Sequence, residues 1–182
     1  MKALKKIAID IVPVLAGVII ALFINNWNED RNDARFIDQT LAALQLEIAA
    51  SKADADEIVP KHLLLYDSLQ QHLEDDSLSI LQMIQITSGI QYFTIENAAW
   101  QALLNGNIQL VDHPTFARLN QIDVFKGSLQ RHVERLNNFV MNNVTDTSKE
   151  SKMKLMLHIH NLIDTEQRVQ ELMDAHVKAH KS

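Results

Sequence analysis

The chain opens with one long apolar run. From Ile7 to Ile24 it reads IAIDIVPVLAGVIIALFI, in which 15 of 18 residues are Ala, Val, Ile, Leu or Phe. As a helix this run is about 27 Å long, close to the thickness of about 30 Å of a bilayer's hydrocarbon core. Lysines precede the run at positions 2, 5 and 6, and Trp27 follows it. This pattern predicts one transmembrane helix with polar flanks on both sides.

A cleaved signal peptide and a buried helix of a soluble domain are the two alternatives to a membrane anchor. A signal peptide carries small residues at two positions before its cleavage site, but Ala21 is paired with Phe23 at that spacing. Buried helices rarely combine this length with such sharp polar boundaries. The sequence therefore favours an uncleaved signal-anchor, with residues 1–24 forming a cytoplasmic tip and a single-pass transmembrane helix.

The basic residues around the run predict its orientation. Three lysines and the amino terminus precede it, whereas Arg31 and Arg35 follow it. This modest bias favours a cytoplasmic amino terminus. In a bacterium it places the remainder of the chain in the periplasm, held at the inner membrane, and a cytoplasmic domain is the alternative. The chain has no Cys, so an oxidising compartment would not affect it.

Asp10 is the only charged residue within the run. A carboxylate at the centre of a bilayer costs about 2.5–3.5 kcal/mol, which is the basis for a functional interpretation as an intramembrane polar contact. Asp10 lies about one turn inside the lysine-rich end, where it can reach water or pair with Lys6. The cost of the charge falls toward the interface, so this second interpretation is favoured.

Between Asn25 and Val59 the pattern changes to that of a helix with one apolar face. No Pro or Gly interrupts it, and apolar or small side chains recur at steps of three and four: Ile37, Leu41, Leu44, Ile48, Ser51, Ala55 and Ile58. This spacing predicts that the transmembrane helix continues as one rod that ends before Pro60, with residues 25–59 as a juxtamembrane stalk.

The apolar face of the stalk has two candidate partners. In a heptad register Glu47 and Lys52 take complementary flanking positions, as in a parallel coiled coil of two copies of the chain. However, Ser51 and Ala55 would lie in the seam, which makes it a weak one. Packing against the other helices of the same chain is therefore favoured.

Residues 60–182 predict an antiparallel helical bundle that packs with the stalk. Capping residues, Gly and Pro divide them into helices over about 63–73, 78–87 and 95–104, then a long helix from Asp112 and a last one that ends near Ala179. Gly89 closes the second of these and Thr94 caps the third. Residues 90–95 are predicted to be an extended connector with aromatic side chains inward. The two long helices have these predicted core faces: Phe116, Leu119, Ile122, Phe125, Leu129, Val133, Leu136 and Val140, and Leu155, Ile159, Leu162, Val169 and Met173.

The composition agrees with an all-α chain and excludes several functions. Of 182 residues only four are Gly and three are Pro, which leaves little material for the turns of a β-protein. Residues 25–182 carry 14 basic and 22 acidic side chains, a net charge of −8, which argues against a nucleic-acid partner. Without Cys there is no disulfide, catalytic thiol or cysteine-ligated metal.

The polar residues form no recognisable catalytic, metal or cofactor motif. His176 and His180 share a helical face at the spacing of a two-histidine ligand pair, but a third ligand is missing, so solvated histidines are favoured. His158 and His160 project from different sides of a helix, and His62 has no partner at a recognisable spacing. No glycine-rich phosphate loop or nucleophile elbow occurs. The sequence therefore predicts no catalytic residue, no metal site, no cofactor and no enzyme.

Two short blocks carry a resemblance to a known family. After the apolar run the chain reads NNWNEDR over residues 25–31, and later it reads NAAWQALLNG over residues 97–106. The first block resembles the start of a family of uncharacterised small single-anchor bacterial membrane proteins, and the second is similar to the family's aromatic-containing helix. This resemblance implies a single-anchor bacterial protein with a helical domain. It implies no activity, cofactor or catalytic residue.

The predicted site lies directly after the apolar run. Its residues form a collar at the membrane interface or a docking surface for a partner. The collar consists of Asn25, Asn26, Trp27, Asn28 and Arg31. Asn side chains bind headgroups, while the Trp27 indole suits the interface; the same amides also bond well between helices. A membrane-exit motif is favoured over a docking surface.

These features predict a membrane-anchored, non-enzymatic helical interaction protein that forms a homo-oligomer or serves as an accessory subunit for a membrane-protein partner. Its first partner is the lipid bilayer itself. The alternative is a periplasmic small-ligand receptor or enzyme with a pocket between helices, around Tyr92, Phe93, Trp100 and His113. Transport through an oligomer, with Asp10 facing the pore, is a third class.

Overall fold

The structure, a computed structural model, describes residues 2–87, 89–106 and 108–179, and it describes side chains from Leu15 onward. Its helices are α1 (Lys2–Gln71), α2 (Ile80–Ile86), α3 (Ala98–Asn105), α4 (His113–Asn143) and α5 (Lys149–Ala179), with a short 3₁₀ turn at Ile108–Leu110. No strand occurs in these residues, so the prediction of an all-α chain is confirmed.

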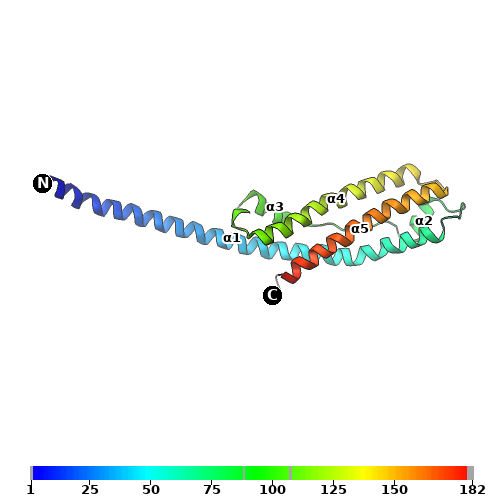
Figure 1. Cartoon of the computed structure of the whole chain (residues 1–182), viewed down its shortest axis with the longest axis horizontal. Helices are drawn as coiled ribbons and strands as arrows, with labels where there is room; N and C mark the ends of the chain where they lie inside the picture. Colours follow the sequence, from blue (N-terminus) through cyan, green and yellow to red (C-terminus); the bar gives the residue numbers. More distant parts are fainter. Residues whose placement is uncertain (1, 88, 107, 180–182) are drawn as a thin grey trace.

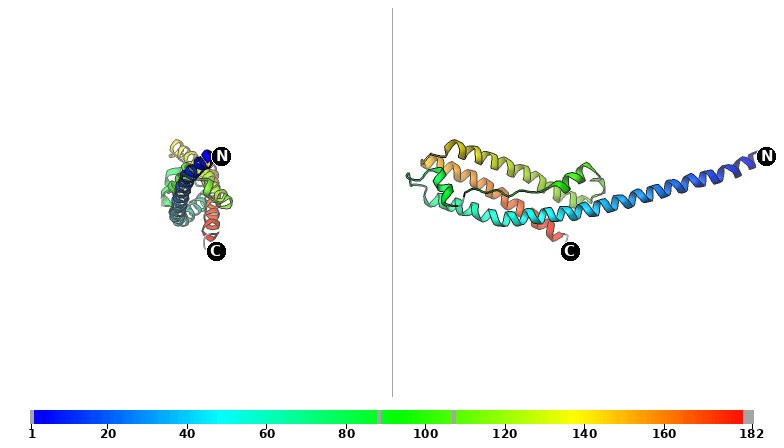
Figure 2. Two further views of the ribbon diagram at one scale, coloured as in Figure 1. Left: turned by 90° about the vertical axis from the view of Figure 1, so that its left-hand side faces the viewer. Right: turned by 180° about the vertical axis from the view of Figure 1, so that it is seen from behind.

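The chain forms an up-down-up-down bundle from which half of α1 protrudes (Figure 1). The second half of α1 runs up one side, α4 and α5 form an antiparallel pair, and α5 packs against both α1 and α4. The segment from α2 to α3 returns along the bundle between α1 and α4, as the rear view in Figure 2 shows. The predicted antiparallel bundle packed with the stalk is therefore observed.

Helix α1 is a single helix of 70 residues that passes through Pro60. The prediction that the rod ends before Pro60 and that a new helix starts near Leu63 is therefore wrong. Proline removes one N–H and crowds the carbonyl four residues earlier, but Pro60 lies on the exposed face, where water can bind that carbonyl. The buried stripe continues on the other face without a break: Ala55, Val59, His62, Leu65 and Leu69.

Contact between α1 and the bundle begins well after the apolar run. Every side chain over residues 15–32 is exposed, and the first buried one is Leu44. Leu44, Ile48, Ser51 and Ala55 are buried within the chain's own bundle, on the face that the heptad register would have offered to a second copy. For this part of the stalk the favoured interpretation, packing against other helices of the chain, is confirmed.

Helix α2 and the loop after it follow the predicted order with shifted bounds. Ser79, one residue into the expected helix, is the N-cap; its hydroxyl accepts from the Gln82 N–H, and the Gln82 side chain accepts from the Ser79 N–H at 2.9 Å. Gly89 closes the helix as predicted, with φ of 82° and its N–H bonded to the Ile84 carbonyl.

Helix α3 starts at Ala98, and its N-cap residue is Asn97. The prediction that Thr94 caps this helix is therefore wrong. Residues 89–97 stay extended because Phe93 and Ile95 are buried in strand-like alternation with exposed neighbours. The acceptor at the N-terminus of α3 comes from another helix. The Glu47 carboxylate accepts from the Ala99 N–H at 3.1 and 3.2 Å, and this negative charge also suits the helix dipole.

The two long helices match their predictions most closely. Asp112 caps α4, with Oδ1 accepting from the Thr115 N–H at 2.9 Å. The turn into α5 is held by Asp146, whose carboxylate accepts from the Ser151 hydroxyl and the Ser148 N–H. These hydrogen bonds lower the pKa of Asp146 to about 2. The predicted core residues of α5 are all buried: Leu155, Ile159, Leu162, Val169 and Met173.

Candidate functional site

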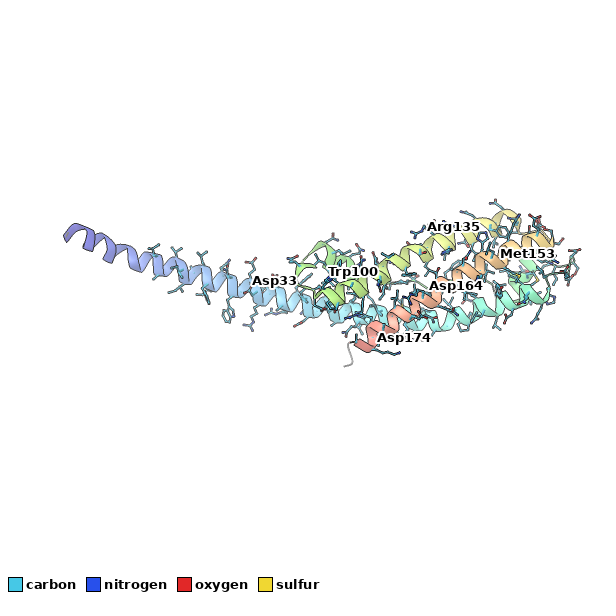
Figure 3. The ribbon with its side chains drawn as sticks, in the orientation of Figure 1. Asp33, Trp100, Arg135, Met153, Asp164 and Asp174 are labelled. Atoms are coloured by element: carbon cyan, nitrogen blue, oxygen red, sulfur yellow. The ribbon has the colours of Figure 1, made fainter. Side chains whose placement is uncertain are left out.

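The predicted collar lies on the protruding part of α1, away from the bundle. Asn25, Asn26, Trp27, Asn28 and Arg31 are all exposed, and four consecutive helical positions place the collar's polar groups around the whole helix. Trp27 and its neighbours border a shallow hollow with Ala21 and Ile24. The structure brings no other described element to these residues, and Figure 3 shows the side chains of this part of α1 standing clear of the bundle.

The structure describes the side chains of the second part of the predicted span, from Leu15 to Ile24, and those of the collar. The side chain of Asp10 lies outside the described side chains, so the structure does not bear on its contacts. Within the described residues, no helix is both long enough and apolar enough to cross a bilayer.

A buried ionisable pair, His62 with Glu166, joins α1 to α5. Nδ1 of His62 lies 2.9 Å from a carboxylate oxygen of Glu166, and both side chains are 1% exposed. They are 104 residues apart in sequence, so no local spacing reveals the pair. The only signal in the sequence is indirect: each residue lies on the apolar stripe of its helix, where a polar side chain needs a buried partner.

The geometry of this pair suits a structural role better than catalysis. A carboxylate that orients a histidine is also found in catalytic dyads, where the second ring nitrogen faces the substrate. Here Nε2 of His62 is buried and has no hydrogen-bond partner in the described part of the chain. A substrate could not reach this nitrogen without opening the bundle. The pair therefore acts as a polar connection between α1 and α5.

Tyr92 covers the pair from the extended connector. Its ring centroid lies 6.2 Å from that of His62, and its hydroxyl donates to Oδ1 of Asn137 on α4 at 2.7 Å. Burial, together with the nearby charge of Glu166, raises the pKa of Tyr92 to about 12. The connector is thus attached to both α1 and α4 at this level of the bundle.

A slot of about 300 Å³ opens between the connector and α4, beside Tyr92. Its floor and walls are largely apolar, with one cationic and one anionic side chain at the edge; the lining residues are Tyr92, Phe93, Thr94, Ile95, Lys126, Leu129, Gln130, Val133 and Glu134.

The aromatic pocket predicted as an alternative site is not assembled as expected. Tyr92 and Phe93 line the slot, but Trp100 borders a separate space of about 20 Å³. Trp100 lies near the end of the bundle from which α1 protrudes (Figure 3) and packs against Phe116. His113 is exposed at the start of α4 and lines neither space. The four residues of the predicted pocket therefore lie in different parts of the bundle.

The histidines near the C-terminus differ from their prediction. His176 is fully buried rather than solvated, because it lies on the same stripe of α5 as Met173 and Val169. His180 lies outside the described residues. His158 and His160 project from different sides of α5 as expected, toward Phe139 and Tyr66 respectively. Among the described side chains no three His, Asp or Glu residues are grouped as a metal site requires.

Lys152 is a further buried charge that sequence reasoning did not identify. Its side chain is fully buried, and its ammonium group donates to the carbonyl oxygens of His72 and Asp75. These carbonyls follow the last turn of α1, where a helix needs donors and where a positive charge suits its dipole. Lys152 therefore fastens the end of α1 to the start of α5.

No known family model, curated protein or solved structure matches this chain. The resemblance of residues 25–31 and 97–106 to a family of single-anchor membrane proteins stays a prediction.

Proposed function

We propose that this chain is a membrane-anchored, non-enzymatic interaction protein, in which residues 1–24 hold a helical bundle at one face of a bilayer. The observation that carries the proposal is the exposure of the apolar side chains before the collar. Leu15, Val18, Ile19, Ile20, Leu22, Phe23 and Ile24 are each more than half exposed, and Phe23 reaches 76%.

These side chains surround the helix on all sides. A helix that is apolar all round is stable inside a protein or in a membrane, whereas in water a protruding helix of this kind has no partner for its surface. The run continues without interruption back to Ile7, to a total length of about 27 Å. The polar collar that follows, with the Trp27 indole, suits a bilayer interface.

The rod between the collar and the bundle sets the height of the bundle. From Asn25 to Ile37, the first half-buried apolar residue of the stripe, α1 rises about 18 Å. Leu110, in the turn after α3, borders a hollow with Asp30 and Asp33, so this end of the bundle would lie only about 8 Å beyond Asn25. With a cytoplasmic amino terminus, in a bacterium, the bundle would lie in the periplasm.

The proposal of an interaction role rests on what the bundle offers. Three of the buried polar side chains described above, His62, Glu166 and Lys152, join helices. A rigid rod that carries a closed bundle suits a subunit that self-associates or binds a membrane-protein partner through the collar or the bundle surface.

Alkaline carbonate extraction of membranes that contain the full-length chain tests the anchor. We expect the chain to stay in the membrane pellet, because a run of 18 residues with 15 apolar side chains makes peripheral release unfavourable. Replacement of Ile19 and Phe23 by Lys should release it to the supernatant. The anchor is excluded if the unmodified chain is washed off.

A second experiment tests the interaction role. After extraction in detergent, the mass of the complex and the identity of co-purified chains are determined for the unmodified protein and for the Asn26→Ala/Trp27→Ala variant. Docking through the collar predicts an oligomer or a partner that this variant loses. The control Leu46→Ala, at an exposed position on the packed half of α1, should keep it. A lone monomer in every case would contradict the interaction role.

A further inference from the structure

The bundle has four antiparallel segments, and the slot beside Tyr92 lies next to the one that is not a continuous helix. α1, α4 and α5 are continuous helices, but the segment from α2 to α3 consists of two short helices joined by the extended residues 89–97 (Figure 2). A helix with its side chains is about 10–12 Å across, whereas neighbouring strands lie only about 4.8 Å apart. The extended connector therefore leaves unfilled space between itself and α4, and the slot of about 300 Å³ is that space.

The backbone that borders the slot has unused hydrogen-bonding groups. Within the described chain, the backbone N–H and C=O groups of residues 91–95 make no hydrogen bond to another residue. The next N–H, that of Glu96, donates to Ser51 on α1 at 3.1 Å. Successive amides of an extended chain point to opposite sides, so those of Phe93 and Ile95 are directed away from α1, toward α4 and the slot.

Two opposite charges lie at the ends of the slot. Lys126 and Glu134 are eight residues apart on α4, which is a separation of about 12 Å along the helix axis. Neither forms an ion pair or hydrogen bond with another described residue. Four residues of extended chain span about 13 Å, so a short strand that carries one charge at each end matches this spacing.

We propose that the slot binds an extended peptide segment of a partner protein, which adds as a strand to the edge formed by Phe93 and Ile95. Main-chain hydrogen bonds to this edge supply the affinity, as in other cases of strand addition, and Leu129 and Val133 receive the peptide's inward side chains. Lys126 and Glu134 select a segment with an acidic and a basic end. The inference rests on the proposed interaction function and names the chemistry of the partner.

The test uses the full-length chain in detergent and two acetylated and amidated pentapeptides, KVTVE and EVTVK, whose charged residues are four positions apart. They share one composition and differ only in the order of the charged ends, so the orientation of the strand decides between them. Fluorescently labelled versions are titrated by anisotropy. We expect one peptide to bind with a Kd of about 1 mM or tighter and the other at least about tenfold more weakly.

Two modifications distinguish strand addition from simple apolar binding. N-methylation of either the two Val amides or the amides of the Thr and the fifth residue blocks alternate sides of the peptide, so one pattern should abolish binding and the other should retain it. The double variant Lys126→Glu/Glu134→Lys should exchange the preference between the two peptides. The matched control Glu150→Lys/Lys154→Glu, an exposed pair on α5, should leave it unchanged.

The proposal is overturned if neither peptide binds, if both N-methylation patterns act equally, or if the charge exchange leaves the preference as it was. Its failure is distinguishable from failure of the proposed function, because peptide binding in detergent does not depend on membrane anchoring. If carbonate releases the chain but the chain binds one peptide, the membrane anchor is refuted and the peptide slot is supported. If the chain stays in the membrane but binds neither peptide, the peptide slot is refuted and the membrane anchor is supported.

Discussion

Two halves of α1 form one continuous helix but have opposite environments. Over residues 15–32 every side chain is exposed, whereas from Ile37 to Leu69 one face is covered by α5, α3 and the connector (Figure 1). The first half is apolar on all sides up to Ile24, and the second is apolar on one face only. Both halves are helical. They differ in where their apolar side chains lie, which is on all sides of the first half and on one buried face of the second.

This difference explains where the bundle obtains its stability. The packed half contributes a buried stripe to the core, which in water is the main source of favourable free energy. The protruding half contributes nothing to that core, so a change there should leave the bundle's unfolding unaffected. The same change on the packed half should be costly, and variants on the two halves make this contrast measurable.

The largest effect is expected where the packed half carries a buried polar side chain. His62→Ala leaves the carboxylate of Glu166 buried without its partner, which should lower the free energy of unfolding by about 3–5 kcal/mol. The double variant His62→Leu/Glu166→Leu removes both polar groups and should recover most of that loss. Urea unfolding followed by circular dichroism measures both, and equal losses in the single and double variants would contradict a coupled pair.

The next effect contrasts two adjacent leucines on the packed half. Leu65 is fully buried and Leu64 is 63% exposed. Leu65→Ala should cost about 2–5 kcal/mol through lost burial and a cavity, whereas Leu64→Ala should stay within about 0.5 kcal/mol. Ile20→Ala on the protruding half should also leave the bundle's urea midpoint unchanged. A clear shift with Ile20→Ala would show that the protruding half takes part in the folding of the bundle.

A smaller and opposite effect is expected at Gly127, one of two glycines that lie within helices. At Gly127 on α4 an added Cβ would meet only the end of the Arg131 side chain, at 3.5 Å. Gly127→Ala should therefore raise the free energy of unfolding by about 0.5–1 kcal/mol by reducing the entropy of the unfolded chain. Gly17→Ala, on the protruding half, should leave the bundle's thermal midpoint where it is. A lower midpoint for Gly127→Ala would indicate a kink that needs glycine.

The last prediction changes an ionisation constant. Tyr66→Phe leaves Tyr92 as the only tyrosine, and its absorbance at high pH should follow a pKa of about 12. The folded chain keeps the Tyr92 proton longer than the unfolded chain, so the bundle should lose stability as pH rises from about 10 to 12. Ionisation near pH 10 in the folded protein would contradict the burial of Tyr92 beside Glu166.

The helices that could be predicted from the sequence are those whose signals are local. Asp112 with Pro114 fixes the start of α4, and the stripes of α4 and α5 follow from steps of three and four residues. Pro60 misled the prediction, because the tertiary burial of Val59 and Leu65 outweighs a local break signal on the exposed face.

The contacts that could not be predicted are those between distant residues. Glu47 takes the place of Thr94 as the acceptor at α3, His62 finds Glu166, and Lys152 reaches the end of α1. Each joins two helices whose relative register only the folded bundle sets. The slot forms because one segment of the bundle is extended and the other three are helical. The sequence predicted the extended connector but not the space beside it.

The most direct test of the central claim is the depth of Trp27 in a bilayer. In a Trp100→Phe variant Trp27 is the only tryptophan, and its fluorescence is measured in vesicles whose lipids carry bromine at different depths. We predict a blue-shifted emission and the strongest quenching by bromine near the headgroups, because the collar lies at the interface. Emission as in water, with no quenching at any depth, would contradict a membrane anchor formed by residues 1–24.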